Sequence, residues 1–281
     1  MLEQKPHSFK ETIMSIENLS LRLGDNLILR DITIGIKNVV RPDVIQGQIV
    51  AILGRSGIGK TQLFRTIAGL QNPTGGNILV GENRKPIRIG QVGVVTQNYY
   101  FSSRLTVINT LIRAGKQAGL NAKSAREKGL ELLQKFGIAD RRNFYRAQLS
   151  GGQRQRVAII EQLMCSDDLL LMDEPFSGLD ERSKQSACEM IAEVANEREK
   201  NTIIITTHDI EYALKIAGFV WLMGRDRDEK GNFIEGSRVI EIVDLINMDL
   251  AWQPEIHLIP EFNTLLRELK NKFLDPNSQY A

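Results

Sequence analysis

Three groups of residues in this sequence have types and spacings suited to chemistry on a phosphate-bearing ligand. The first group reads Gly-Arg-Ser-Gly-Ile-Gly-Lys-Thr and fits the pattern G-x-x-x-x-G-K-[ST]. Glycines at this spacing let successive backbone N–H groups point at an anion, and the following helix directs its positive end to the same place. An ordinary strand–turn–helix corner is the structural alternative. The predicted contacts of this phosphate loop are Gly54, Arg55, Ser56, Gly57, Ile58, Gly59, Lys60 and Thr61.

The second group is a pair of carboxylates, Asp173 and Glu174, that directly follows the apolar run of residues 169–172. Such a run predicts a buried strand, and ligands of α/β proteins bind at the carboxyl ends of strands. Alone, an Asp-Glu pair is more often a solvated helix start. The phosphate loop upstream and the sequence Pro-Phe-Ser-Gly-Leu-Asp downstream favour a functional pair.

The third group is the signature run, residues 149–153, which reads Leu-Ser-Gly-Gly-Gln. Ser150 can cap the helix that follows and leave the N–H groups of Gly151 and Gly152 free to face a phosphate. A plain capped helix is the alternative. Two single residues complete the candidates, because Gln97 and His208 each follow an apolar strand-like segment.

In their order and spacing these groups resemble the ATP-binding-cassette (ABC) ATPases. The resemblance implies that ATP and Mg²⁺ bind here, and that the signature run serves the ATP held by a second subunit. It implies that Lys60 contacts the β- and γ-phosphates, that Glu174 positions or activates the attacking water, and that His208 contacts the γ-phosphate. The implied Mg²⁺ ligands are Thr61, Gln97 and Asp173. The implied catalytic residues are Glu174, His208, Gln97 and Lys60, and further implied nucleotide contacts are Thr66, Ser150, Gly151, Gly152, Gln153 and, at the dimer seam, Asp180.

Composition narrows the class of protein. The chain has 281 residues, enough for one large α/β domain or two modest ones, and a net charge of only +2, which gives no bulk attraction to nucleic acid. No apolar run approaches the roughly 18 residues that span a bilayer, and residues 1–12 lack the apolar centre of a secretory signal. Two isolated cysteines suggest neither a disulfide framework nor a zinc site, and a reducing cytosol is the simplest setting.

The hydrophobic pattern predicts an α/β fold. Strands alternate with helices, which favours a parallel sheet covered on both faces. The resemblance implies that this sheet belongs to a P-loop NTPase core, preceded by an antiparallel β subdomain and interrupted by a helical signature subdomain. Expected strands are a hairpin at 14–36 and segments 48–53, 87–96, 169–172 and 202–206; expected helices are 60–70, 124–136, 181–200 and 259–273. The charged, turn-rich stretch 225–236 is expected to link two further strands.

These elements predict a polar tail at 1–13, an ABC ATPase domain at 14–225 with its helical subdomain at about 99–165, and a C-terminal extension at 226–281. Three positions depart from the family pattern. Leu23 occupies the slot of the usual adenine-stacking aromatic, so we expect weaker discrimination for adenine. Residues 37–47 form a longer connection than usual, and Glu161 replaces a common arginine.

The resemblance implies an ATPase that energises transport, with a motif style closest to importers of the nitrate, sulfonate and taurine group. Its partners would be a second copy or a homologous ATPase subunit, integral membrane permease subunits and an external substrate-binding protein, with no direct nucleic acid contact. It would then lie in the cytoplasm, peripheral on the inner face of the cell membrane. Tyr99, Tyr100 and Phe101 are equally suited to a permease groove or to the core. The alternatives are an ABC ATPase of ribosomes or DNA, and a nucleotide-binding scaffold without turnover.

Overall fold

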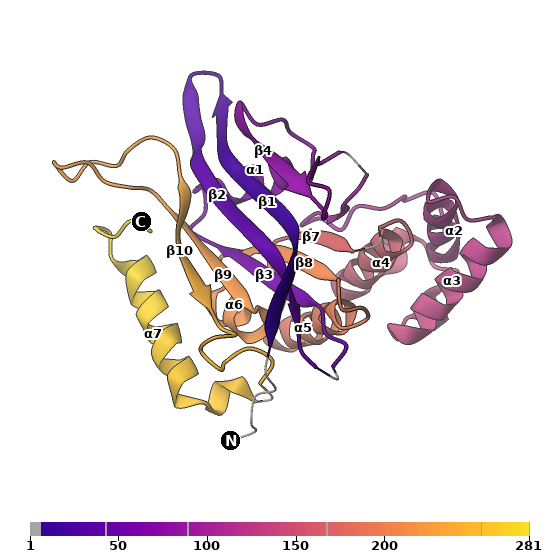
Figure 1. Cartoon of the computed structure of the whole chain (residues 1–281). Coiled ribbons are helices and arrows are strands. Elements are labelled where there is room, and N and C mark those ends of the chain that lie inside the picture. Colours follow the sequence, from indigo (N-terminus) through magenta and orange to yellow (C-terminus); the bar gives the residue numbers. More distant parts are fainter. Residues whose placement is uncertain (1–6, 43, 89, 167, 254, 281) are drawn as a thin grey trace.

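The computed structural model describes residues 7–42, 44–88, 90–166, 168–253 and 255–280. Two sheets form its centre (Figure 1). The first is antiparallel with strand order β2-β1-β4-β5. Its strands are β1 (Ser8–Leu23), β2 (Asn26–Val40), β4 (Gly75–Val80) and β5 (Lys85–Pro86).

The second sheet is parallel except for its edge strand β10, and its order is β10-β9-β3-β8-β7-β6. Leu53 pairs with Thr207, and Asp173 pairs with Thr206, so β3, β7 and β8 end at one common edge. The strands are β3 (Gln48–Leu53), β6 (Gly93–Val95), β7 (Leu169–Asp173), β8 (Thr202–Thr207), β9 (Phe219–Gly224) and β10 (Arg238–Asp244).

Both faces of the parallel sheet are covered, which explains why its strands read as continuous apolar runs. Ala51 and Leu53 of β3 pack into one hydrophobic cluster with α5 (Glu181–Ala195) and α6 (Ile210–Ile216). Val50 and Ile52 pack into the other, with α1 (Lys60–Ile67) and the antiparallel sheet. The phosphate loop therefore begins from a strand fixed on both sides.

The helical subdomain lies to one side of the sheets (Figure 1). It contains α2 (Val107–Gln117), α3 (Ala122–Lys135) and α4 (Gly151–Leu163), with short 3₁₀ turns η1 (Ala139–Arg141) and η2 (Arg146–Gln148) between α3 and α4. Asn121 caps α3 by accepting a hydrogen bond from Ser124 N, and Ser150 caps α4. None of the helices in the described ranges is both long and apolar enough to cross a bilayer.

The C-terminal residues share the core of the rest of the chain. Strand β10 pairs with β9, and the turn η3 (Ile256–Leu258) leads into α7 (Pro260–Leu274). Phe262, Leu265 and Leu269 of α7 belong to the same hydrophobic cluster as α5 and α6. Strand β10 thus extends the parallel sheet, and η3 and α7 pack against its helices.

Three predicted boundaries are wrong. Strand β1 begins at Ser8 rather than near residue 14, because its pairing with β2 continues to Ser8 opposite Val40; the predicted tail 1–13 therefore overlaps a strand, and residues 1–6 lie outside the described residues. The same pairing carries β2 to Val40, into the connection predicted at 37–47. The strand predicted at 87–96 is limited to Gly93–Val95, the three residues that pair with β7.

Candidate functional site

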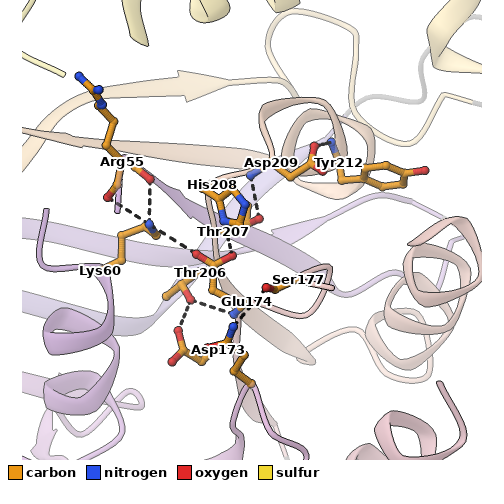
Figure 2. A network of polar contacts seen from close by, with 12 residues as sticks. Arg55, Lys60, Asp173, Glu174, Ser177, Thr206, Thr207, His208, Asp209 and Tyr212 are labelled. Carbon is orange, nitrogen blue, oxygen red and sulfur yellow. Dashed lines mark hydrogen bonds and ion pairs between the residues drawn. The ribbon is translucent and has the colours of Figure 1, made fainter. Parts of the chain in front are cut away.

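The phosphate loop connects β3 to α1 and has the backbone that its glycines predict. Gly57 and Gly59 have positive φ values of 83° and 102°, in a backbone region that residues with a Cβ rarely adopt. Lys60, at the start of α1, is buried, and its Nζ donates to the carbonyls of Gly54 (2.8 Å) and Arg55 (3.2 Å) (Figure 2). The loop is thereby closed around the lysine amine.

Two threonines of α1 differ in their surroundings. Thr61 is exposed in the first turn, next to the loop. Thr66 is buried farther along the helix, and its hydroxyl donates to the Gln62 carbonyl at 2.7 Å. That bond turns Thr66 back onto its own helix. The structure does not bring the predicted contact Thr66 to the phosphate loop.

The predicted carboxylates lie at the same sheet edge, held by Thr206 of β8. The Thr206 hydroxyl donates to Asp173, and the Glu174 N–H donates to the Thr206 carbonyl at 3.0 Å. Glu174 has a φ of 49°, so the chain turns sharply where β7 ends. Two adjacent carboxylates therefore point in different directions.

The Glu174 carboxylate lies between two cationic or proton-bearing groups (Figure 2). One oxygen is 3.5 Å from Lys60 Nζ, and the other is 2.9 Å from His208 Nδ1. Because an ionised carboxylate only accepts hydrogen bonds, this contact makes Nδ1 the protonated nitrogen of His208. The His208 ring itself is 57% exposed and can meet a ligand from solvent.

Gln97 joins this edge from the end of β6. Its amide nitrogen donates at 3.1 Å to the hydroxyl of Ser177, which lies three residues after Glu174 in the chain. Thr61, Asp173 and Gln97 offer hydroxyl, carboxylate and amide oxygens, the type of ligand that Mg²⁺ prefers. No group of three or more His, Cys, Asp or Glu in the described ranges could hold a metal alone. Mg²⁺ usually takes one or two carboxylates plus substrate phosphates, so these residues fit a Mg²⁺ that arrives with a nucleotide.

The signature run forms the N-terminal cap of α4. Ser150 Oγ accepts from Gln153 N (3.3 Å), and Gln153 Oε1 accepts from Ser150 N (3.0 Å). A Cβ added at Gly151 or Gly152 would meet no atom within 4 Å in the described part of the chain. Packing within this chain therefore does not require glycine at either position.

Asp180 caps α5 in the same way. Its carboxylate accepts from Ser183 N at 2.8 Å, and this hydrogen bond lowers the pKa of Asp180. The first turns of α5 are tied to the loop that carries His208, since Lys184 Nζ lies 2.6 Å from Asp209 Oδ2 and the Tyr212 hydroxyl donates to Glu181 at 2.7 Å. The dimer-seam candidate and the histidine candidate thus belong to one polar network.

Sequence reasoning missed a point of convergence at the carbonyl of Pro175. Tyr99 Oη donates to it at 3.1 Å and Gln155 Nε2 at 3.0 Å. Burial raises the pKa of Tyr99 to about 12, so its hydroxyl stays protonated and remains a donor. These bonds link the segment after Gln97, the signature helix and the residue after Glu174. No local pattern in the sequence signals this.

The structure separates the three neighbouring aromatics. Tyr99 and Phe101 are 8% and 7% exposed and belong to the core, whereas Tyr100 is 74% exposed under the Arg146 guanidinium.

Leu23, the first departure from the family pattern, is exposed at the tip of the β1–β2 hairpin. Glu161, the other departure, is buried in α4 and has a partner, because Arg113 of α2 lies 3.4 Å from its carboxylate.

Comparison with known proteins identifies the family. A sequence model described as ABC transporter matches residues 38–177. A sulfate/thiosulfate import ATP-binding protein of Gloeobacter violaceus is 34% identical over 267 residues, which cover 90% of this chain and 73% of that protein. The chain belongs to the ABC transporter ATP-binding family.

Further comparisons agree. A sulfate/thiosulfate import ATP-binding protein of Rhizobium meliloti is 32% identical over 76% of this ABC chain. A solved ABC transporter component from Clostridium perfringens superposes with a TM-score of 0.70 at 26% identity, covering 93% of this chain and 98% of that one. The predicted fold class is therefore confirmed.

The chain is shorter than several of these proteins. It spans 56–61% of the length of the first curated relatives that it matches. These relatives are named for sulfate and thiosulfate import, so the expected likeness to nitrate, sulfonate and taurine importers stays a prediction.

Proposed function

We propose that this chain is the ATP-hydrolysing subunit of a membrane transporter, and that its ATP sites form between two ATPase subunits. The observation that carries the proposal is the Lys60–Glu174–His208 contact at the end of the phosphate loop. It places a phosphate-binding amine, a carboxylate and an imidazole together at one sheet edge. Relatives named as import ATP-binding proteins support the same function.

Binding of ATP would begin by exchanging the partners of Lys60. Its amine now donates to the Gly54 and Arg55 carbonyls, and phosphate oxygens carry more charge than either. The N–H groups of the loop and the start of α1 add further donors. Thr61, Asp173 and Gln97 would hold Mg²⁺, which supplies charge neutralisation at the phosphates.

Hydrolysis would depend on Glu174 and His208. Glu174 accepts a proton from water, the water oxygen forms a bond to the γ-phosphorus, and the bond to the ADP oxygen breaks. His208 Nδ1–H holds the Glu174 carboxylate, and the exposed ring edge contacts the γ-phosphate. Gln97, which donates to Ser177 Oγ, would contact Mg²⁺ and the attacking water.

The second half of each site would come from another subunit. The N–H groups of Gly151 and Gly152 lie at the start of α4, and the open space at both glycines leaves room for a nucleotide held elsewhere. Gln153 stabilises this cap, and Asp180 lies at the seam between subunits. ATP would then favour the closed dimer because it contacts both chains only in that state.

Transport would require permease subunits on the inner face of the membrane and, for import, an external substrate-binding protein. The helical subdomain is the natural contact for a permease, because Tyr100 and α2 present exposed side chains there. The transported substrate is set by those partners.

The test is Glu174→Gln, which keeps the shape of the side chain and removes its basicity. We expect ATP hydrolysis to fall by about 10²–10⁴-fold and an ATP-bound dimer to accumulate, measured by phosphate release and size-exclusion chromatography. Glu131→Gln, on the exposed side of α3, is the control. A Glu174→Gln protein that hydrolyses normally and stays monomeric would rule out the scheme. A wild-type chain that binds ATP without turnover would favour a scaffold.

A further inference from the structure

The segment between β9 and β10, residues 225–237, forms an arm that projects from the sheets (Figure 1), and its last residues are joined to the first residues of β2. Glu235 accepts a hydrogen bond from Leu27 N at 2.6 Å. Arg30 N donates to the Ser237 carbonyl at 2.9 Å. The arm is therefore joined to backbone N–H groups of β2 by one side-chain and one backbone acceptor, and it lies beyond the residues that the family model matches.

Asp226, at the base of the arm, fixes it further. Its carboxylate accepts two hydrogen bonds from Arg238, at 2.7 and 2.9 Å, and also pairs with Arg30 of β2. The Arg238 bonds lower the pKa of Asp226, so the carboxylate is ionised at neutral pH. One side chain thus connects both ends of the arm to the antiparallel sheet.

Ser237 carries this connection into the phosphate loop. The residue is 2% exposed, and its hydroxyl lies within hydrogen-bond distance of the carbonyls of Ile28 (2.9 Å) and Ile58. A hydroxyl has a single proton to donate. The backbone N–H of Ser237 already donates to Ile28 O at 2.9 Å, so Ile28 O keeps a partner when the hydroxyl donates to Ile58 O.

The bond to Ile58 O has a geometric consequence for the loop. The described residues contain no cis peptide bond, and in a trans peptide the C=O and the next N–H point in opposite directions. Holding the Ile58 carbonyl toward Ser237 directs the Gly59 N–H away from the arm. Gly59 has little room for a side chain on the same side, since a Cβ there would lie 3.0 Å from Ser237 Oγ and 3.1 Å from Leu29. The orientation of this peptide, directly before Lys60, is therefore set from outside the loop.

We propose that Ser237 is a positioning residue for the nucleotide phosphates, and that the arm is a built-in support of the phosphate loop. This inference rests on the proposed function, because it assumes that the loop binds a nucleotide. Ser237 touches no ligand itself. It acts by orienting the Ile58–Gly59 peptide, so its loss lets that peptide rotate and weakens binding of the phosphates more than binding of the nucleoside.

The experiment compares ADP and AMP binding by calorimetry at fixed Mg²⁺, for the wild-type chain, Ser237→Ala and Ser278→Ala. Ser278 is the matched control, because its hydroxyl accepts from Tyr280 N at 3.3 Å, away from the loop. We expect Ser237→Ala to weaken ADP binding about five- to tenfold, with AMP binding changed less than about twofold. A role confined to general folding would lower both affinities alike.

Asp226→Asn provides a second variant that leaves the phosphate loop untouched. Removing the charge between Arg30 and Arg238 loosens the arm, and we expect ADP binding to weaken by about two- to threefold. This variant decides the matter if Ser237→Ala does not fold. Unchanged ADP binding in both variants, or equal losses for ADP and AMP, would overturn the inference and leave the proposed function standing. A wild-type chain that binds neither nucleotide would instead overturn the proposed function.

Discussion

Lys60 and Glu174 restrain each other in this structure. The two side chains are 7% and 14% exposed, and their charged atoms are 3.5 Å apart. A buried charge needs a partner, and each of these groups supplies one for the other. In the proposed function, phosphates would take over Lys60, and Glu174 would lose that partner and become free to contact water. The arrangement would then link the arrival of the nucleotide to the readiness of the carboxylate.

Glu161 is another buried carboxyl group with a cationic partner, and it lies away from the phosphate loop. Burial raises the pKa of its carboxyl, and Arg113 only partly offsets this. The folded protein thus binds a proton here more readily than the unfolded chain, so stability from this site falls as pH rises through the raised pKa. The resemblance implies an arginine at this position, and the nearby Arg113 explains how this chain accommodates a carboxylate.

Replacing Glu161 by Gln removes the titration and keeps the shape. Above the raised pKa we expect the variant to be more stable by about 1 kcal/mol in urea unfolding, because the cost of burying a charge is gone. The gain should shrink as pH falls toward about 4.3, the value for an unfolded Glu, where the wild-type carboxyl is protonated in the folded state. Glu131→Gln is the exposed control. A stability difference that does not change with pH would contradict this account.

Hydrogen bonds and an ion pair connect the end of β7, the end of β8 and the start of α5. Thr206 holds both Asp173 and Glu174, and the loop after β8 carries His208 and then Asp209, which pairs with Lys184 of α5. Asp180 caps that same helix. A change at the γ-phosphate can therefore reach the predicted subunit seam through one ion pair.

Lys184→Met tests this link. It leaves the partly buried Asp209 without its cation, which would let the loop bearing His208 shift relative to α5. We expect kcat for ATP hydrolysis to fall about three- to tenfold with nucleotide affinity unchanged, and stability to fall by about 1 kcal/mol.

Lys215→Met is the matched control for this variant. Both lysines lie over the Tyr212 ring, with Nζ 5.3 Å from its centroid for Lys184 and 4.6 Å for Lys215. Lys215 pairs with Glu211 instead of Asp209. Equal kinetic effects in the two variants would show that packing on Tyr212, and not the Asp209 pair, is responsible.

The sequence predicts this edge well because each of its motifs is a short run of adjacent residues. The phosphate loop, Asp173–Glu174 and His208 each follow an apolar strand, and parallel strands end together. The convergence on Pro175 and the contact between Ser237 and Ile58 could not be predicted, because they join residues 20 to 179 positions apart. The strand predicted at 87–96 is too long for a related reason. The hydrophobic pattern shows which residues are apolar, whereas pairing with β7 decides which of them form the strand β6.

In the proposed dimer, the molecule as a whole would supply two separate halves of a ligand site. Its parallel sheet presents the phosphate loop and Glu174, while the N-terminus of α4 presents Ser150 and two glycines that need not be glycine for this chain to pack. A symmetric dimer would bring each half against the other half of its partner. A site shared between two chains and a site built within one chain therefore predict different activities for mixed dimers.

Two inactive variants should restore activity when they are mixed. Lys60→Met removes the phosphate-binding amine, and Ser150→Phe blocks the signature cap, so each homodimer has two defective sites. In a mixed dimer the intact phosphate loop of one chain faces the intact cap of the other, which leaves one of its two sites complete. Random exchange makes half of the dimers mixed, so we expect about a quarter of wild-type ATP hydrolysis. Phosphate release from the mixture, set against each variant alone, measures this. If the site were built within one chain, both sites of a mixed dimer would stay defective and mixing would restore nothing.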